Sequence, residues 1–191
     1  MSDDFSLKTH GIHVRHTQEA DLPAVVLLYS AVCDAMRDTP YDVSWDMSYH
    51  PTEARLLSAI HAGEMLVAER DGNEGGDERF LGAAIVNGVQ EKGYEAADWT
   101  VSADPDRVAV VHLLATAPWA RHVGAGRALI DASAKYARQV GCMSMRLDVW
   151  PNNEPARAMY ERCGMLDKGI HTLDYDSRGV ALACLMELPL V

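Results

Sequence analysis

Two closely spaced glycines, Gly124 and Gly126, stand between an apolar stretch and a segment with helical periodicity. The apolar stretch, residues 108–116, is rich in β-branched side chains and predicts a strand that is buried on both faces. Apolar residues then recur at spacings of three and four from Ala125 onward, and Gly141 follows where a C-terminal glycine belongs. The pattern predicts a strand, a glycine-rich turn and a helix in succession.

This turn has the chemistry of an anion-binding site. The first N–H groups of a helix have no intrahelical partner, and the helix dipole places partial positive charge there. Glycines let a ligand approach the main chain, and Arg121 adds a cation. The segment 121–126 therefore predicts a phosphate or pyrophosphate site, and an ordinary strand–helix turn is the alternative. The P-loop and dinucleotide patterns are both excluded, because Arg127 follows Gly126 and no third glycine stands at the required spacing.

A second strand and helix follow. Residues 144–149 alternate polar and apolar side chains, which predicts a strand with one buried face. Asn153 is a favourable N-cap for the next helix, and Gly164 ends it. The helix places four residues on one face: Ala156, Met159, Tyr160 and Cys163.

These two motifs, in this order and spacing, resemble the GNAT superfamily of acetyl-CoA-dependent N-acetyltransferases. The first motif is Arg121-x-x-Gly124-x-Gly126, and the second is Asn153-x-x-Ala156-x-x-x-Tyr160-x-x-x-Gly164-Met165. A narrower likeness, to an uncharacterised subgroup of bacterial GNAT proteins, is carried by Trp45, Asp98-Trp99, residues 111–116 and residues 146–149. Leu113 and Thr116 depart from the pattern of that subgroup.

The resemblance implies a mixed α/β fold of the GNAT acyl-CoA N-acyltransferase type. We expect about six or seven strands with helices on both faces, and a gap between strands 108–116 and 144–149 for the pantetheine arm. The whole chain, residues 1–191, is expected to be one domain, with residues 1–11 as a flexible lead-in. Polar, Gly-rich stretches predict turns at residues 71–79 and 176–179.

The resemblance also implies acetyl-CoA as co-substrate, without a metal, and transfer of its acetyl group to a primary amine of a small molecule. Main-chain amides of the loop would hold the pyrophosphate, and the strand edge would pair with pantetheine and stabilise the oxyanion. The expected cofactor-binding residues are Leu114, Ala115, Thr116, Arg121, His122, Val123, Gly124, Ala125, Gly126, Asn153 and Tyr160.

Two residues are candidates for proton transfer. Tyr160 occupies the family position that donates a proton to the departing thiolate. His112 lies on the strand where many GNAT proteins have Glu, and a histidine is suited to accept a proton near neutral pH. A buried histidine without catalytic role is the alternative, with Asp148 or Asp46 then serving as base.

An aromatic segment before residue 51 suggests a wall of the acceptor pocket, although a loop packed on the core is the other reading. The expected substrate-binding residues are Tyr41, Trp45, Trp99 and Asp148. Two further functions stay open. One is acetylation of a peptide or protein N-terminus, and the other is a sensor that binds acyl-CoA without transfer. A longer acyl chain is also compatible with the fold.

Composition restricts the partners. The net charge of −11 argues against a nucleic-acid-binding surface and is compatible with a cationic amine. No apolar run approaches the ~20 residues of a membrane span. We expect a cytoplasmic protein, compatible with a homodimer, in which four cysteines are reduced core thiols: Cys33, Cys142, Cys163 and Cys184.

Overall fold

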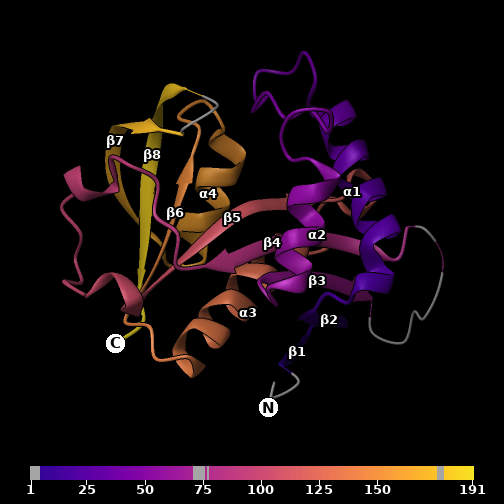
Figure 1. The fold of residues 1–191 in the computed structure, drawn as a ribbon, viewed down its shortest axis with the longest axis horizontal. Coiled ribbons are helices and arrows are strands. Elements are labelled where there is room, and N and C mark those ends of the chain that lie inside the picture. Colours follow the sequence, from indigo (N-terminus) through magenta and orange to yellow (C-terminus); the bar gives the residue numbers. More distant parts are fainter. Residues whose placement is uncertain (1–4, 71–75, 77, 176–178) are drawn as a thin grey trace. The chain divides into compact units, whose positions relative to one another are not determined.

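The computed structural model describes residues 5–70, 76, 78–175 and 179–191, and its elements are labelled in Figure 1. It confirms the mixed α/β class. Two compact units are present. The first comprises residues 1–86 and 113–133, and the second comprises residues 87–112 and 134–191. The expected turns at 71–79 and 176–179 lie largely outside the described residues.

The first unit contains an antiparallel arrangement with the strand order β1-β2-β3-β4. The helices α1 and α2 come between β2 and β3 in the chain. The bounds of these elements are β1 (Ser6–Thr9), β2 (Ile12–His16), α1 (Leu22–Met36), α2 (Glu53–His61), β3 (Met65–Arg70) and β4 (Phe80–Asn87).

Strand β1 differs from the expectation for the N-terminus. Residues 1–11 were expected to form a flexible lead-in, but Ser6–Thr9 pairs with β2, and only residues 1–4 of the segment lie outside the description. The pairing succeeds because His10 and Gly11 both adopt positive φ angles, 48° and 77°, and so make the tight turn between the strands. The described residues therefore contain eight strands, and β1 is the additional one.

Strand β5 (Val108–Thr116) has the expected bounds, but the expected burial on both faces is wrong for its C-terminal half. Residues 112–114 are half-buried and Thr116 is exposed. Within the strand, Leu113 has a φ of +51°, which is unusual for a residue other than glycine. The C-terminal end of the strand approaches β4 closely at Gly82, where a Cβ atom would lie 2.7 Å from the carbonyl oxygen of Ala115. Gly82 is thus required for close strand packing.

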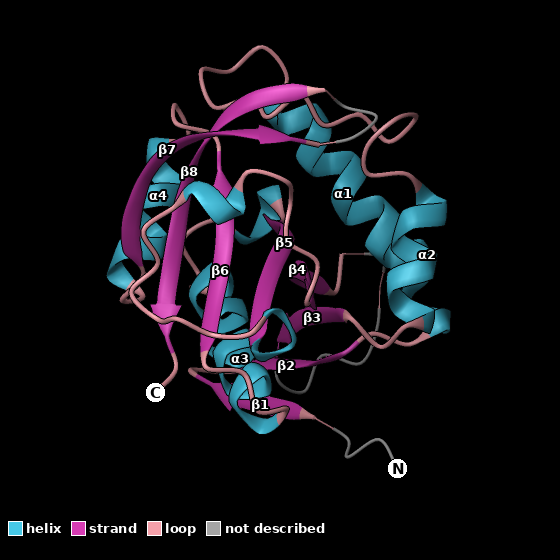
Figure 2. Ribbon diagram, turned by 60° about the vertical axis from the view of Figure 1, so that its left-hand side comes forward, coloured by secondary structure: helices cyan, strands magenta, loops and turns pink. Residues whose placement is uncertain are grey.

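The second unit contains the strand order β5-β6-β8-β7, and its last three strands lie side by side in Figures 1 and 2. Strands β5 and β6 are parallel, whereas β8 is antiparallel to both of its neighbours. The bounds of the remaining elements are α3 (Ala125–Gln139), β6 (Ser144–Val149), α4 (Glu154–Arg162), β7 (Leu166–Asp174) and β8 (Val180–Pro189).

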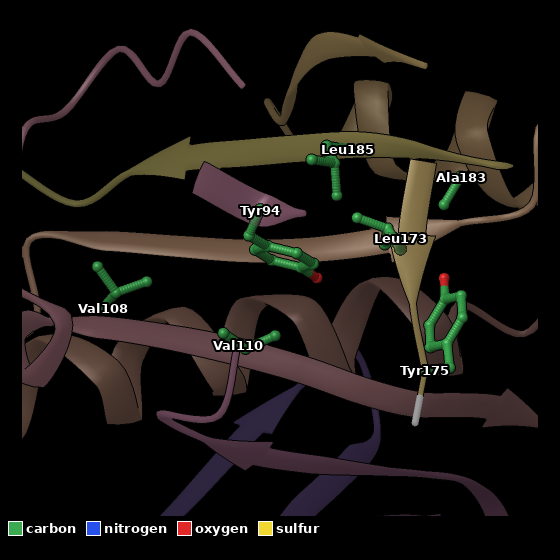
Figure 3. Close-up of a cluster of buried hydrophobic side chains, with 7 residues drawn as sticks. All are labelled: Tyr94, Val108, Val110, Leu173, Tyr175, Ala183 and Leu185. Carbon is green, nitrogen blue, oxygen red and sulfur yellow. The ribbon is translucent and has the colours of Figure 1, made fainter. Parts of the chain in front are cut away.

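A hydrophobic cluster forms the core of the second unit (Figure 3). Tyr94, from a short 3-10 turn, packs there against side chains of three strands and against Tyr175. The full cluster consists of Tyr94, Val108, Val110, Leu173, Tyr175, Ala183 and Leu185. The turn residue Tyr94 thereby joins a loop of the unit to its sheet.

Strand β6 is more buried than its alternating sequence predicts. Ser144 and Arg146 were expected on an exposed face, but both are buried. The reason is Glu187 on β8, which is also buried and accepts a hydrogen bond of 2.9 Å from the Ser144 hydroxyl. Arg146 in turn lies over the ring of Trp99, 4.0 Å from its centroid. Paired polar groups can be buried without a large free-energy cost, so this strand has no solvent-facing side.

The four cysteines belong to the described residues, and all four are outside disulfides, as expected. Cys33 and Cys184 are buried, while Cys142 and Cys163 are partly exposed. Among the described helices, none combines the length and apolar character that crossing a membrane requires.

Candidate active site

The loop that precedes α3 contains the segment for which the sequence predicts a phosphate site. After a 3-10 turn at Pro118–Ala120, the chain from Arg121 to Gly124 is exposed. His122 and Gly124 have positive φ angles of 63° and 90°. A Cβ atom at Gly124 would meet no atom within 4 Å, so glycine is needed there for its backbone conformation.

The first turn of α3 begins directly after this loop. The N–H of Ala128 donates to the carbonyl oxygen of Gly124 over 3.0 Å, which closes the first helical turn. The N–H groups that precede it belong to the helix N-terminus, where intrahelical acceptors are missing. The helix dipole places partial positive charge at such an N-terminus, directly after an exposed loop.

A cavity of about 210 Å³ lies against the same loop. One wall is the turn between β1 and β2, and the other is the first turns of α3. Arg127 and Asp131 of this wall face each other at 3.6 Å, and both are well exposed. The lining residues are Thr9, His10, Ile12, His122, Val123, Gly124, Arg127, Ala128 and Asp131.

Exposure varies from residue to residue along the C-terminal end of β5. Ala115 is buried, Leu114 is half-buried and Thr116 is exposed. In the second unit, the register between β5 and β6 covers only Val108–Val110 with Ser144–Arg146. The rest of β6 continues in register with β8 alone.

His112 is half-buried in the second unit, and Nε2 of its ring lies close to two oxygen atoms. Nε2 lies 3.2 Å from the side-chain oxygen of Asn87 and 3.0 Å from the carbonyl oxygen of Val89. The ring therefore has a defined orientation, set by the end of β4.

Both oxygens of the Asp148 carboxylate accept hydrogen bonds from tyrosines. Tyr94 donates to Oδ1 over 2.9 Å, and Tyr175 donates to Oδ2 over 2.6 Å. Burial raises the pKa of Tyr94 well above its usual range, and the adjacent Asp148 charge raises it further. Figure 3 shows the two tyrosines within the core cluster. Asp148 thus anchors two phenols, a role that the sequence does not predict.

Tyr160 lies on α4, and Asn153 lies directly before it. Only 6% of Tyr160 is exposed, and its hydroxyl donates no hydrogen bond within the described residues. Burial raises the pKa of Tyr160, with further contributions from Asp148 and Cys163, so the phenol is protonated at neutral pH. Asn153 caps the helix, because its side-chain oxygen accepts from the N–H of Ala156 over 3.4 Å.

The expected substrate-binding residues have different surroundings. Tyr41 is exposed, while the ring of Trp45 lies 6.0 Å from that of Tyr29. In the second unit, Trp99 donates its indole N–H to the carbonyl oxygen of Tyr94 over 2.8 Å. Trp99 and Asp148 are thus brought together through Tyr94, whereas Tyr41 and Trp45 belong to the first unit.

Asp46, the other candidate base, is an exposed turn residue. It accepts hydrogen bonds from the hydroxyl and the N–H of Ser48 over 2.6 and 2.8 Å. These hydrogen bonds lower the pKa of Asp46, which makes its carboxylate a poor proton acceptor at neutral pH.

Four residues that contact or support the candidate site residues were not found by sequence analysis: Tyr29, Asn87, Tyr94 and Tyr175. Asn87-Gly88 is a turn signal at the end of a strand, so Asn87 had a local signature. The tyrosines have none, because their partners are remote in the sequence.

Comparison with known proteins identifies the family of the chain. Residues 30–165 match the model of the Acetyltransferase (GNAT) family. No curated protein matches the chain. A GCN5-related N-acetyltransferase from Kribbella flavida has 20% identity and a TM-score of 0.65, covering 94% of this chain and 98% of its own.

Two further solved structures share the fold. yncA from Salmonella typhimurium, solved with its cofactor acetyl-CoA, has 18% identity and a TM-score of 0.65, with 95% of each chain covered. A GNAT-family acetyltransferase from Streptococcus agalactiae has 16% identity and a TM-score of 0.75, covering 96% of this chain and 98% of its own. At such identities the likeness concerns the fold. Because the family model spans more than two thirds of the sequence, from the middle of α1 to the end of α4, the chain belongs to the GNAT acetyltransferase family and is an acyltransferase.

Proposed function

We propose that the protein transfers the acetyl group of acetyl-CoA to a primary amine of a small molecule, by direct attack of the amine on the thioester. The observation that supports this most is the exposed loop from Arg121 to Gly124 at the start of α3, with positive φ angles at His122 and Gly124. Main-chain N–H groups at a helix N-terminus bind phosphate groups. A GNAT relative of the same fold, yncA, was solved with acetyl-CoA.

The proposed cofactor contacts follow from this loop. The amides from Arg121 to Gly126 bind the pyrophosphate, and Arg121 contributes its positive charge. The main chain of Leu114, Ala115 and Thr116 pairs with the pantetheine arm in the manner of an added strand. An N–H of that edge stabilises the oxyanion that forms on the thioester carbonyl. Asn153, which caps α4 in the second unit, is a further proposed cofactor contact.

Proton transfer is assigned to His112 and Tyr160. His112 accepts the proton of the amine, because the carboxylate oxygens of Asp148 already each accept a phenol. Tyr160 donates to the thiolate that leaves. Its raised pKa keeps the phenol protonated, and its hydroxyl has no hydrogen-bond partner among the described residues that would compete.

The residues proposed to bind the acceptor are Tyr41 and Trp45 of the first unit and Trp99 and Asp148 of the second. Aromatic rings and a carboxylate attract an ammonium group, and the net charge of −11 favours a cationic substrate. The proposed location is the cytoplasm, which is consistent with the four reduced thiols. No metal, nucleic acid or membrane takes part in the proposal.

A screen for CoA release tests this function. Purified protein is incubated with acetyl-CoA and, separately, with polyamines, small aromatic amines, amino acids and short peptides. Release of CoA and mass-spectrometric detection of an acetylated small amine would support the proposal. Turnover of peptides alone would favour an N-terminal acetyltransferase. Saturable acetyl-CoA binding without release for every acceptor would favour a sensor and contradict the proposal.

A further inference from the structure

The end of β4 holds His112 through a hydrogen-bonding arrangement that determines which ring nitrogen carries a proton. Nε2 faces two oxygen atoms, Oδ1 of Asn87 at 3.2 Å and the carbonyl oxygen of Val89 at 3.0 Å. Both partners belong to the same short turn, which leaves β4 at Asn87.

Other contacts show that both partner atoms of Nε2 are oxygens that can only accept hydrogen bonds. The N–H of Val89 donates to Oδ1 of Asn87 over 3.0 Å, so this atom must be the amide oxygen and not the amide nitrogen. The second partner is a main-chain carbonyl. Neither oxygen can donate a hydrogen bond, so Nε2 must be the donor. In a neutral imidazole only one nitrogen carries hydrogen, and the other nitrogen is then the basic one.

We propose that Asn87 is a positioning residue that holds neutral His112 in its Nε2–H tautomer, so that Nδ1 is the atom that accepts the proton of the amine. The catalytic part of this inference rests on the proposed function. The ammonium nitrogen loses a proton to Nδ1, and its freed lone pair attacks the thioester carbonyl carbon to form the oxyanion. When the oxyanion collapses, the C–S bond breaks and the thiolate takes the proton of Tyr160. The new amide nitrogen then loses its second proton, which restores the Tyr160 phenol. The His112 imidazolium keeps its Nε2–H bond to the turn.

A neutral partner suits a base that must release its proton again. Asn87 carries no charge, whereas a carboxylate at the same place would stabilise the imidazolium and raise the pKa of the ring. Few charged groups on the neighbouring strands could influence the protonation of His112. Strand β4 carries no charged residue, and His112 is the only titratable residue of β5.

The other charged groups come from β6 and from the loop. On β6, Val110 pairs with Arg146, so alternation places His112, Arg146 and Asp148 on one sheet face. Arg146 donates to Gln90 and to the carbonyl oxygen of Val101, and Asp148 accepts from its two tyrosines. Glu91 and Lys92 follow in the loop, and Lys92 pairs with Asp174. Asn87 and Val89 supply the hydrogen-bond acceptors that face Nε2.

The first test is nuclear magnetic resonance of ¹⁵N-histidine-labelled protein without substrate, with the His112 signals assigned by their loss in His112→Ala. Long-range ¹H–¹⁵N correlations distinguish the two tautomers. We expect the Nε2–H form in the neutral ring. Observation of the Nδ1–H form, or of both forms in similar amounts, would overturn the proposal. This readout does not depend on finding an acceptor, so it is separate from the test of the function.

The second test compares Asn87→Asp with Val89→Asp. The aspartate at 87 keeps an oxygen for the Val89 N–H and places a negative charge beside Nε2, so the variant should fold. We expect the pKa of His112, followed by the same resonances, to rise by about one unit. The Val89 side chain is exposed, so a charge there is screened by solvent and should produce a much smaller rise. Equal shifts in the two variants, or none, would contradict the contact.

Kinetics complete the test once an acceptor is known. The acidic limb of the pH profile of kcat/KM should move to higher pH in Asn87→Asp by the shift seen in the resonances. Asn87→Leu, which removes the acceptor, should lower kcat about tenfold with an unchanged KM for acetyl-CoA. If the resonances shift and the kinetic limb does not, His112 is not the base, and the tautomer assignment alone is retained.

Discussion

The hydroxyl of Tyr29 on α1 donates a hydrogen bond of 2.7 Å to the carbonyl oxygen of Leu113 on β5, although 84 residues separate them in the chain. Leu113 adopts a left-handed backbone conformation in the middle of a strand, with a φ of +51°. Such a conformation costs free energy and persists only where the surroundings stabilise it. Tyr29, which is fully buried, supplies that stabilisation immediately before the segment 114–116 to which we assign the pantetheine arm.

Tyr29→Phe should destabilise the protein. The change leaves the carbonyl oxygen of Leu113 without its hydroxyl partner at a buried position, which costs about 1–3 kcal/mol of unfolding free energy. Urea denaturation followed by circular dichroism measures the loss. Tyr41→Phe is the control, because Tyr41 is exposed and should change stability by less than about 0.5 kcal/mol. Equal stability of the two variants would show that the Leu113 conformation needs no support from Tyr29.

Gly124→Ala should weaken acetyl-CoA binding about tenfold, equivalent to about 1.4 kcal/mol. An alanine disfavours the φ of +90° that the loop requires, although its Cβ would meet nothing within 4 Å. Gly141→Ala is a matched control at the other end of α3, since Gly141 has a φ of +89° and equally open space. Isothermal titration calorimetry should show reduced affinity in the first variant only, with similar destabilisation in both. Equal affinities would remove the loop from the cofactor site.

Tyr160→Phe should lower kcat by about tenfold to a thousandfold, while the affinity for acetyl-CoA stays unchanged. In the proposed mechanism the phenol donates a proton to the thiolate, and phenylalanine keeps the buried ring but cannot donate. Because burial raises the pKa of Tyr160, the wild-type enzyme should show no loss of rate from tyrosine ionisation at mildly alkaline pH. Initial rates of CoA release across the pH range measure both effects. An unaltered turnover would remove Tyr160 from the mechanism.

Acid should destabilise the first unit through Asp21. Burial raises the pKa of Asp21, but the hydrogen bonds from Arg15 and Gln18 and the charges of Arg15 and Arg79 outweigh burial, so the net pKa lies below its usual 3.8. A carboxyl group with a lowered folded-state pKa stabilises the fold above its unfolded pKa. That contribution is lost as the pH falls through the folded value.

The corresponding variant is Asp21→Asn. Urea denaturation should show a lower unfolding free energy than wild type at neutral pH and a weaker dependence on pH below 3.8. Asp34→Asn is the control, because Asp34 pairs with Arg37 on the surface, where ion pairs contribute little. A steep acid limb that persists in Asp21→Asn would assign the effect to other carboxyl groups.

The elements that frame the proposed cofactor site could be predicted from the sequence, because their signals are local. Strand β5, the glycine turn, α3 and α4 follow from apolar periodicity, an Asn N-cap and glycines at helix ends. Gly141 and Gly164 indeed have φ angles of +89°. The motif Arg121-x-x-Gly124-x-Gly126 likewise depends on residues a few positions apart. The family could be recognised from these signals, because each one depends on residues that lie within one or two helical turns of one another in the sequence.

Only the tertiary structure decided which side chains support the site residues. Asn87 lies 25 residues from His112, and Tyr94 lies 54 residues from Asp148. The burial of Ser144 likewise depends on Glu187, 43 residues away. Local sequence propensities cannot predict such pairs, because a hydrogen bond across the core forms only when the fold makes the two strands neighbours. The sequence by itself determined the strand, turn and helix that bind the cofactor in our proposal, and chain packing determined which groups contact His112 and Asp148.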